Sequence, residues 1–307
     1  MPAGKVDGLH SASTFGATRD FWWNQDHLAL VAGRLGLAGV GSILDVGSGV
    51  GHWGQLLLGS VVGPQATLIG VEREPAWVVE ATARAAGARL GDRVRYVQGV
   101  AQSLPFGDAS FDLVTCQTLL MHVPDPGAVL REMLRVLRPG GVILAAEPNS
   151  RASVLVDTDP DASVEELVDL LQFYLTCERG KLALGEGDSS IGDLLPRYLA
   201  DQGAVEIQTF IADKTTRMTP PYASEEQQAV ATGLLGGADR WIWSRGETER
   251  FFIAGGGAPG DFDAGWDRRI AERRAVADRV RANAFHGAGA TIHYVVAARR
   301  PAAPTNT

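Results

Sequence analysis

The fold of this chain is set by one glycine-rich run, Ile43-Leu44-Asp45-Val46-Gly47-Ser48-Gly49-Val50-Gly51-His52-Trp53-Gly54. The run follows a short apolar segment and precedes a helical one, so it predicts a tight strand-to-helix turn. Glycines at alternate positions let the backbone bend sharply and approach a bound ligand without interference from Cβ atoms. The run therefore indicates a ligand-binding loop, with Gly47, Gly49 and Gly51 as expected ligand contacts.

Two acidic residues end the first two expected strands. Asp45 lies just before the glycines, and Glu72 ends the next strand within Val71-Glu72-Arg73-Glu74. From the position of Glu72 a carboxylate can accept hydrogen bonds from both hydroxyls of a ribose. Asp45 supplies a carboxylate where a cationic group of the ligand can sit.

The charge of Asp45 bears on which nucleotide-type ligand the loop binds. Residues 49–54 formally match the dinucleotide fingerprint, and such a match alone is weak. A dinucleotide would place its pyrophosphate beside Asp45, where like charges repel. S-adenosylmethionine carries an ammonium and a sulfonium instead, which a carboxylate attracts. The sequence favours S-adenosylmethionine; a nicotinamide-dependent oxidoreductase and a glycine-rich turn without a ligand are the alternatives.

Short β-rich runs alternate with helical segments from residue 42 onward, a pattern typical of a parallel sheet with crossover helices. The expected strands are 42–46, 66–72, 93–98, 111–116, 141–147, 204–211 and 290–298. The expected helices are 76–88, 126–137, 164–178, 191–202, 224–235 and 264–284. The sequence thus predicts an α/β fold with a Rossmann-like, seven-stranded core.

Three segments lie outside this expected core. Residues 1–40 are expected to form a helical N-terminal arm, residues 151–190 a helical insertion, and residues 212–289 a mainly helical lid on the substrate side. The last of these is far longer than an ordinary connection between strands. The core then comprises residues 41–150, 191–211 and 290–300.

Composition limits the class of protein. The chain has 307 residues, 45% of them hydrophobic, and a formal net charge of −8, which disfavours a nucleic-acid partner because phosphate backbones are bound through clustered positive charge. No run approaches the ~20 apolar residues of a membrane helix, so we expect a cytoplasmic protein without membrane insertion. Cys116 and Cys177 have no Cys or His at metal-ligand spacing, so no metal is implied. The oligomeric state is not indicated.

Several segments of the chain resemble motifs of a known enzyme family. Residues 44–51 resemble motif I of class I methyltransferases, and further pieces follow in the same order. Residues 99–106 (Gly-Val-Ala-Gln-Ser-Leu-Pro-Phe) resemble the adenine-side loop, residues 111–117 the fourth strand, and residues 119–126 and 134–141 complete the set. Together they are similar to the ubiquinone/menaquinone C-methyltransferase-like group over about residues 40–150.

The resemblance implies S-adenosylmethionine as cofactor and a small-molecule acceptor, which it does not identify. It adds Arg73, Ala101, Gln102 and Gln117 to the expected cofactor contacts. One position departs from the group, which usually has Asp where this chain has Val100. The resemblance then leaves Ala101 as a backbone contact to the adenine edge and the Gln102 amide as a substitute acceptor.

Methyl transfer from a sulfonium depends mainly on positioning, because the methyl group is already strongly electrophilic. A general base helps when the acceptor carries a proton. His122, after the fourth strand, and Glu147, at the end of the fifth, are the catalytic candidates, since both belong to the rim where parallel sheets bind ligands. Each has a structural alternative: His122 as the cap of a helix, and Glu147 as a hydrogen-bond partner of a helix or loop.

Aromatic residues cluster outside the expected core, at Phe21, Trp22, Trp23, Phe173, Tyr174, Trp241, Trp243, Phe251 and Phe252. Such side chains can enclose an apolar acceptor and shield a sulfonium, whereas simple packing of the added helices is the alternative. We expect Trp22, Trp23, Tyr174 and Trp243 to line the acceptor pocket. The predicted function is a C- or O-methylation in specialised metabolism; a non-catalytic S-adenosylmethionine-binding protein is the non-enzymatic alternative.

Overall fold

The computed structural model describes residues 16–154, 162–239 and 241–302. The chain divides into two compact units. We call residues 23–149, 190–213 and 292–307 the sheet unit, and residues 1–22, 150–189 and 214–291 the helical unit. The N-terminal forty residues are thus shared between the two units, with the division after Trp22.

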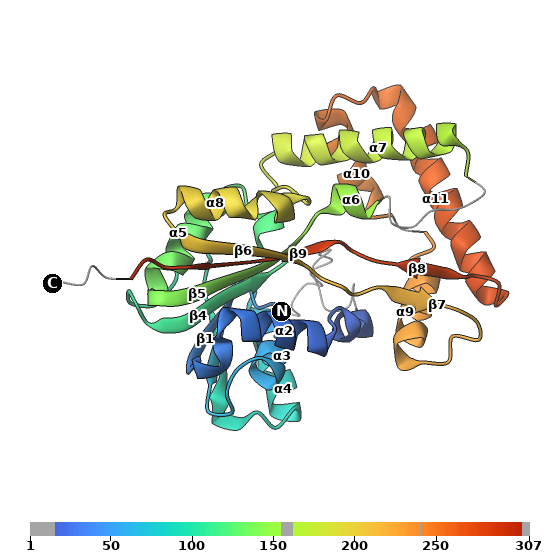
Figure 1. The fold of residues 1–307 in the computed structure, drawn as a ribbon. Coiled ribbons are helices and arrows are strands. Elements are labelled where there is room, and N and C mark those ends of the chain that lie inside the picture. Colours follow the sequence, from blue (N-terminus) through green and yellow to red (C-terminus); the bar gives the residue numbers. More distant parts are fainter. Residues whose placement is uncertain (1–15, 155–161, 240, 303–307) are drawn as a thin grey trace, which may run out of the picture. The chain divides into compact units, whose positions relative to one another are not determined.

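The sheet unit is built on seven strands in the order β3-β2-β1-β4-β5-β9-β6 (Figure 1). Strands β3, β2, β1, β4 and β5 run parallel, and β9 pairs antiparallel with both β5 and β6. The bounds are β1 Ser42–Val46, β2 Thr67–Glu72, β3 Val94–Gln98, β4 Phe111–Gln117, β5 Leu137–Pro148, β6 Val205–Ile211 and β9 His293–Arg299. The predicted α/β, Rossmann-like fold is confirmed; the last strand begins three residues later than expected.

Helices of the sheet unit cover the sheet with apolar faces. They are α2 Gln25–Leu35, α3 His52–Ser60, α4 Pro75–Gly87, α5 Pro126–Val136 and α8 Leu195–Asp201, with 3₁₀ turns η2 Leu37–Gly39, η3 Gly91–Arg93, η4 Leu120–His122 and η5 Ile191–Leu194. Helix α5 shows how the local sequence sets the start of a helix and its buried face. Asp125 caps it by accepting from the Ala128 N–H, and Pro126 occupies its first position. Its buried side, including Leu130 and Met133, joins the core beneath β4 and β5.

The helical unit consists of helices and one short strand pair. Its elements are η1 Gly16–Phe21, α6 Ser150–Ser153, α7 Val164–Ala183, β7 Thr216–Met218, α9 Glu225–Gly236, α10 Arg245–Ala254, α11 Pro259–Arg281 and β8 Gly287–Gly289. Strands β7 and β8 pair antiparallel. Helix α10 and the two strands were not anticipated from the sequence.

Helices α7 and α10 pack closely because a glycine of α7 lies against the backbone of α10 and a glycine at the end of α10 lies against the backbone of α7. A Cβ at Gly180 would lie 1.7 Å from the Phe251 carbonyl oxygen, and one at Gly255 would lie 1.9 Å from the Thr176 carbonyl oxygen. Around this contact lies an aromatic core formed by Phe173, Tyr174, Trp243, Phe251, Phe252, Phe262 and Trp266. The glycines near residue 255 therefore serve close packing within the helical unit.

Candidate cofactor and active site

The glycine-rich loop connects β1 to α3 and needs glycine at three positions. Gly47, Gly49 and Gly51 have φ angles of +68°, +51° and +86°, in the left-handed region that side chains disfavour. A Cβ at Gly47 would also lie 2.7 Å from a methyl carbon of Leu119. The Gly47 and Ser48 N–H groups both donate to the Val71 carbonyl, which fastens the loop to the end of β2.

Asp45 lies beneath this loop, and one of its carboxylate oxygens has no hydrogen-bond partner among the described residues. Its side chain is 1% exposed, and Oδ2 accepts from the Gly54 N–H at 3.0 Å. Oδ1 is buried and has no hydrogen-bond partner among the described residues, and the same holds for the Ser48 hydroxyl. Burial raises the pKa of Asp45 to about 7, and the negative charge of Glu72 adds to this, while the bond from Gly54 opposes it.

Glu72 ties the glycine loop to the end of β2. Its Oε2 accepts from the Gly49 N–H at 2.9 Å, and its Oε1 accepts from the Glu74 N–H at 3.0 Å. Each carboxylate oxygen can accept a further bond, so the residue can hold the loop and still receive ligand hydroxyls. The adjacent Arg73 points to solvent and pairs with Glu74.

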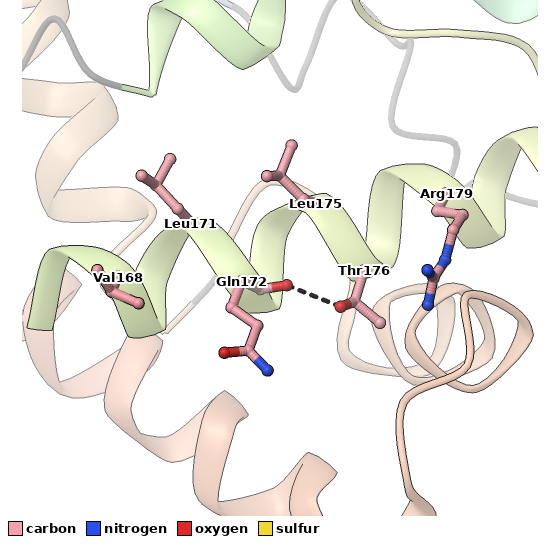
Figure 2. Close-up of a pocket in the computed structure, with 6 residues that line it drawn as sticks. All are labelled: Val168, Leu171, Gln172, Leu175, Thr176 and Arg179. Atoms are coloured by element: carbon pink, nitrogen blue, oxygen red, sulfur yellow. Dashed lines mark hydrogen bonds between the residues drawn. The ribbon is translucent and has the colours of Figure 1, made fainter. Parts of the chain in front are cut away.

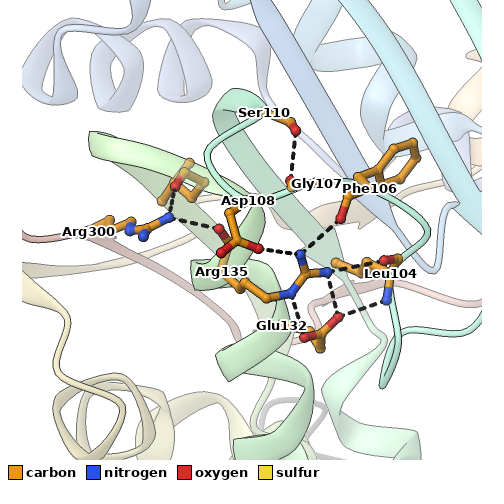
Figure 3. A network of polar contacts seen from close by, with 9 residues as sticks. Leu104, Phe106, Gly107, Asp108, Ser110, Glu132, Arg135 and Arg300 are labelled. Carbon is orange, nitrogen blue, oxygen red and sulfur yellow. Dashed lines mark hydrogen bonds and ion pairs between the residues drawn. The ribbon is translucent and has the colours of Figure 1, made fainter.

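The loop after β3 is held from below by helix α5, as Figure 3 shows. Arg135 donates from Nη2 to the Leu104 carbonyl at 3.1 Å and from Nη1 to the Phe106 carbonyl at 2.9 Å. Glu132 pairs with Arg135 and accepts from the Leu104 N–H at 2.9 Å. This network fixes a loop that also carries Ala101, which is half-buried, and Gln102, which is exposed.

Sequence reasoning missed the role of Glu132 and Arg135. The signal available was their spacing of three residues in a predicted helix, which allows an ion pair on one face. That spacing does not reveal that Arg135 turns toward carbonyl groups of a loop about thirty residues earlier in the chain.

Glu147 is enclosed at the end of β5. It is 0% exposed, and its Oε1 accepts from the N–H groups of Leu119 and Leu120, each at 2.8 Å. Its Oε2 accepts from the Met121 N–H at 3.3 Å. Burial raises the pKa of Glu147 to about 7, although these backbone bonds oppose the rise. The contacts match the structural alternative, in which Glu147 positions the segment after β4; nothing in them gives access to an acceptor.

The segment held by Glu147 carries the remaining residues expected at this edge. Gln117 ends β4, and His122 ends the 3₁₀ turn η4; both are half-buried. Thr118 between them has a φ of +49°, so the backbone turns sharply directly after β4. This turn brings Leu119 against Gly47 of the glycine loop.

The predicted aromatic pocket residues fall into both units. Trp23 belongs to the sheet unit, where its ring lies 4.9 Å from that of Trp53 and 5.5 Å from that of His293. Trp53 donates to the Thr115 hydroxyl at 2.7 Å, and Thr115 pairs with Asp45 across the sheet. Trp23 therefore lies at the carboxyl edge of the sheet, and its indole Nε1 is buried without a partner among the described residues.

The other three aromatic candidates belong to the helical unit. Trp22 stacks with the Arg19 guanidinium. Tyr174 and Trp243 lie parallel, with ring centroids 6.0 Å apart, and both are buried in the aromatic core. For these two residues the contacts correspond to the packing alternative.

Another histidine at the carboxyl edge, His27, was not predicted from the sequence. The Nδ1 of His27 in α2 lies 3.9 Å from Oδ1 of Asp213, and Asp213 accepts from the Asn24 amide at 3.0 Å. Asp213 follows the end of β6, where the Ala212 N–H donates to the His293 carbonyl. No sequence pattern joins residues separated by nearly 190 positions.

Figure 2 shows a shallow pocket that is independent of these residues. It lies along one side of α7 in the helical unit and is lined by Val168, Leu171, Gln172, Leu175, Thr176 and Arg179. None of the predicted site residues lines it. Within the described part of the chain no cluster of His, Cys, Asp and Glu could hold a metal ion, and no described helix is long and apolar enough to span a bilayer.

Comparison with known proteins agrees with this geometry. Residues 44–145 match a family described as methyltransferase domain. A ubiquinone biosynthesis O-methyltransferase of Xanthomonas euvesicatoria pv. vesicatoria is 35% identical over 147 residues, which are 44% of this chain and 59% of that protein. The ubiquinone/menaquinone biosynthesis C-methyltransferase UbiE of Roseobacter denitrificans is 29% identical over 196 residues, which are 61% of this chain and 73% of that protein.

A solved structure supports the same fold. The YcgJ protein of Bacillus subtilis aligns with 91% of this chain and 100% of its own length, with a TM-score of 0.52 and 18% identity. The match to the O-methyltransferase spans little more than half of that relative's length. The family match over residues 44–145 contains the glycine loop, the Glu72 position and the strand that ends in Gln117.

Proposed function

We propose that this chain, whose residues 44–145 match a methyltransferase domain family, is a class I S-adenosylmethionine-dependent methyltransferase that methylates a carbon or oxygen atom of a small-molecule acceptor. The observation that carries the proposal is Asp45, a buried carboxylate beneath a loop of left-handed glycines; one of its oxygens has no hydrogen-bond partner in the part of the chain that the structure describes. An ammonium group would satisfy that oxygen by a charge-assisted hydrogen bond. A pyrophosphate would meet repulsion there.

We propose the following cofactor contacts. Asp45 binds the ammonium of the methionyl part, and Glu72 receives the ribose hydroxyls while keeping its bonds to the loop. The backbone of Gly47, Gly49 and Gly51 lies against the ligand. Ala101 and Gln102 contact the adenine edge, and Arg73 and Gln117 flank the site. When bound, S-adenosylmethionine supplies an electrophilic methyl group on a sulfonium.

The chain's own contribution to the reaction is positioning and exclusion of water. Glu147 holds the segment after β4, which presents His122 and Gln117 at the carboxyl edge. We assign Glu147 to positioning and His122 to an assisting base at most. Trp23 supplies an apolar wall on the side of β9.

The names of two relatives support a proposal for the acceptor class. Both curated relatives carry names from quinone biosynthesis, one as an O-methyltransferase and one as a C-methyltransferase. We therefore propose a quinol-like or phenolic acceptor, in quinone or specialised metabolism. The aromatic ring of such an acceptor suits an apolar wall such as Trp23.

The test is a turnover assay with a defined panel of acceptors. The protein is incubated with methyl-labelled S-adenosylmethionine and each of several demethylated quinols, catechols and simple phenols, and products are analysed by mass spectrometry. We expect S-adenosylhomocysteine and a labelled acceptor in equal amounts for at least one member. Asp45→Asn serves as the control, with much reduced turnover.

Calorimetric binding of S-adenosylhomocysteine and of NADH, measured beside the turnover assay, separates the alternatives. Binding of S-adenosylhomocysteine without turnover of any member would favour a non-catalytic S-adenosylmethionine-binding protein. Tighter binding of NADH than of S-adenosylhomocysteine would favour an oxidoreductase and contradict the proposal.

A further inference from the structure

We propose that Tyr96 is a positioning residue for cofactor binding, which holds the glycine-rich loop in its binding conformation through Gly51 and Gln55. The inference rests on the proposed function, because it assumes that the loop receives S-adenosylmethionine. Tyr96 belongs to β3, two strands away from β1, which leads into the loop.

One row of residues across three strands makes this reach feasible. Asp45 of β1 is in register with Gly70 of β2, and Gly70 is in register with Tyr96 of β3. Residues in register on parallel strands point to the same face of the sheet. Because Gly70 has no side chain, the Tyr96 ring occupies its place: a Cβ at Gly70 would lie 2.3 Å from Cδ1 and 2.4 Å from Cε1 of Tyr96.

The Tyr96 hydroxyl ends directly against the loop. A Cβ at Gly51 would lie 2.2 Å from this hydroxyl oxygen, so the oxygen lies against the last left-handed residue before α3. The hydroxyl accepts from the Gln55 Nε2 at 2.8 Å, and the Gln55 backbone N–H donates to the Gly51 carbonyl at 3.2 Å. Tyr96, Gln55 and Gly51 thus form a closed set of contacts at the start of α3.

The loop needs such support because glycines are the residues with the most conformational freedom to lose. A loop with three left-handed glycines would otherwise be ordered at the moment of binding, at a cost in affinity. Tyr96 is buried, and burial raises the pKa of its hydroxyl further above neutral pH. The contacts of Tyr96, Gln55 and Gly51 lie within the sheet unit and involve no ligand, so the support is present in the free protein.

Calorimetric binding of S-adenosylhomocysteine tests the proposal without an acceptor. Tyr96→Phe removes the hydroxyl and keeps the ring over Gly70, so the fold is retained. We expect the dissociation constant to rise about 3- to 10-fold, the range for one net hydrogen bond. Gln55→Ala should raise the dissociation constant by a similar factor. The double variant should bind S-adenosylhomocysteine about as tightly as the weaker-binding single variant, because both substitutions act through one set of contacts.

The matched control is Tyr222→Phe. It removes a buried tyrosine hydroxyl that bonds to the backbone of Phe285 in the helical unit. It should lower stability and leave the affinity for S-adenosylhomocysteine unchanged. A loss of affinity in this control equal to that of Tyr96→Phe would reduce the effect to general destabilisation and overturn the proposal.

Hydrogen exchange of the free protein provides a readout that does not depend on the cofactor. Amides of residues 47–51 should exchange several-fold faster in Tyr96→Phe than in wild type. Unchanged exchange, or weakened binding in Tyr96→Phe with full affinity in Gln55→Ala, would mean that Tyr96 does not act through the loop. Failure of the wild type to bind S-adenosylhomocysteine contradicts the proposed function instead, and the exchange comparison still decides the role of Tyr96.

Discussion

Asp45 is buried, and one of its oxygens has no hydrogen-bond partner among the described residues. The protonation state of its carboxyl group should therefore affect ligand affinity. With a pKa raised to about 7 by burial, the folded free protein holds this carboxyl largely protonated below neutral pH. An ammonium group binds the ionised form. Cofactor affinity is thus coupled to loss of the Asp45 proton.

We predict that affinity for S-adenosylhomocysteine rises with pH between about 5.5 and 8, by up to about tenfold per unit below pH 7. The sign follows because the ionised fraction of Asp45 increases through its pKa while the ligand's ammonium stays charged. Asp45→Asn should bind more weakly by about 1 to 3 kcal/mol at pH 8 and lose most of the pH dependence. Calorimetry across this range checks it; an equally steep dependence in Asp45→Asn would assign the titration elsewhere.

A variant of Glu147 can distinguish a positioning role of this residue from a catalytic one. Its carboxylate accepts three backbone bonds while fully buried. Glu147→Gln replaces one acceptor oxygen by an NH₂ group that faces donors, so we predict a loss of about 1 to 3 kcal/mol in the free energy of unfolding. Denaturant unfolding measures this. Unchanged stability together with abolished turnover would instead support Glu147 as a base.

The residues that could be predicted from the sequence are those at strand ends. The strand-end positions of Asp45 and Glu72 follow from a strand, a glycine run and a second strand, all local patterns. Tyr96 and His27 could not be found in this way. Their contacts depend on register across strands and on segments far apart in the chain, and neither leaves a periodic signal.

Among the elements, helix α5 and the loop after β3 are joined by side-chain hydrogen bonds. Arg135 and Glu132 together bond to Leu104 and Phe106 of that loop (Figure 3). We predict that Arg135→Ala speeds hydrogen exchange in residues 99–108 and weakens S-adenosylhomocysteine binding several-fold. Arg131→Ala, an exposed arginine on the same helix, is the control and should change neither. Unchanged exchange in Arg135→Ala would show that the loop is held by other contacts.

Glycines in the helical unit have opposite predicted effects according to their surroundings. Gly180→Ala places a Cβ 1.7 Å from the Phe251 carbonyl and should destabilise by about 2 kcal/mol or more, because α7 and α10 must move apart. Gly233→Ala in α9 meets no atom within 4 Å and should stabilise by about 0.5 to 1 kcal/mol. Thermal unfolding of both variants checks this pair; similar effects would contradict the close packing of α7 on α10.

Helix α10 illustrates why an element can be missed. Its buried residues are few, Thr248, Phe251 and Phe252, and they do not repeat along the helix as an apolar stripe would. The usable signal was at its start, where Ser244 and Glu247 form a capping box. The core strands were easier to predict from the sequence, since parallel strands covered on both faces are continuously apolar.

At the scale of the whole molecule, sequence reasoning covered the sheet unit far better than the helical unit. The alternation of strands and helices over residues 42–148 is long and regular, and it predicts one architecture. The helical unit is assembled from three separate segments, 1–22, 150–189 and 214–291. Its aromatic core depends on contacts between the second and third of these segments, which single-sequence patterns do not encode.

We propose that the glycine loop binds S-adenosylmethionine through Asp45. Calorimetric titration of the wild type and Asp45→Asn with S-adenosylhomocysteine and, separately, with NADH at pH 8 tests this binding. We expect one site per chain for S-adenosylhomocysteine, weakened in the variant, and little or no binding of NADH. Tighter binding of NADH than of S-adenosylhomocysteine, or equal affinity of the two proteins for S-adenosylhomocysteine, would contradict it.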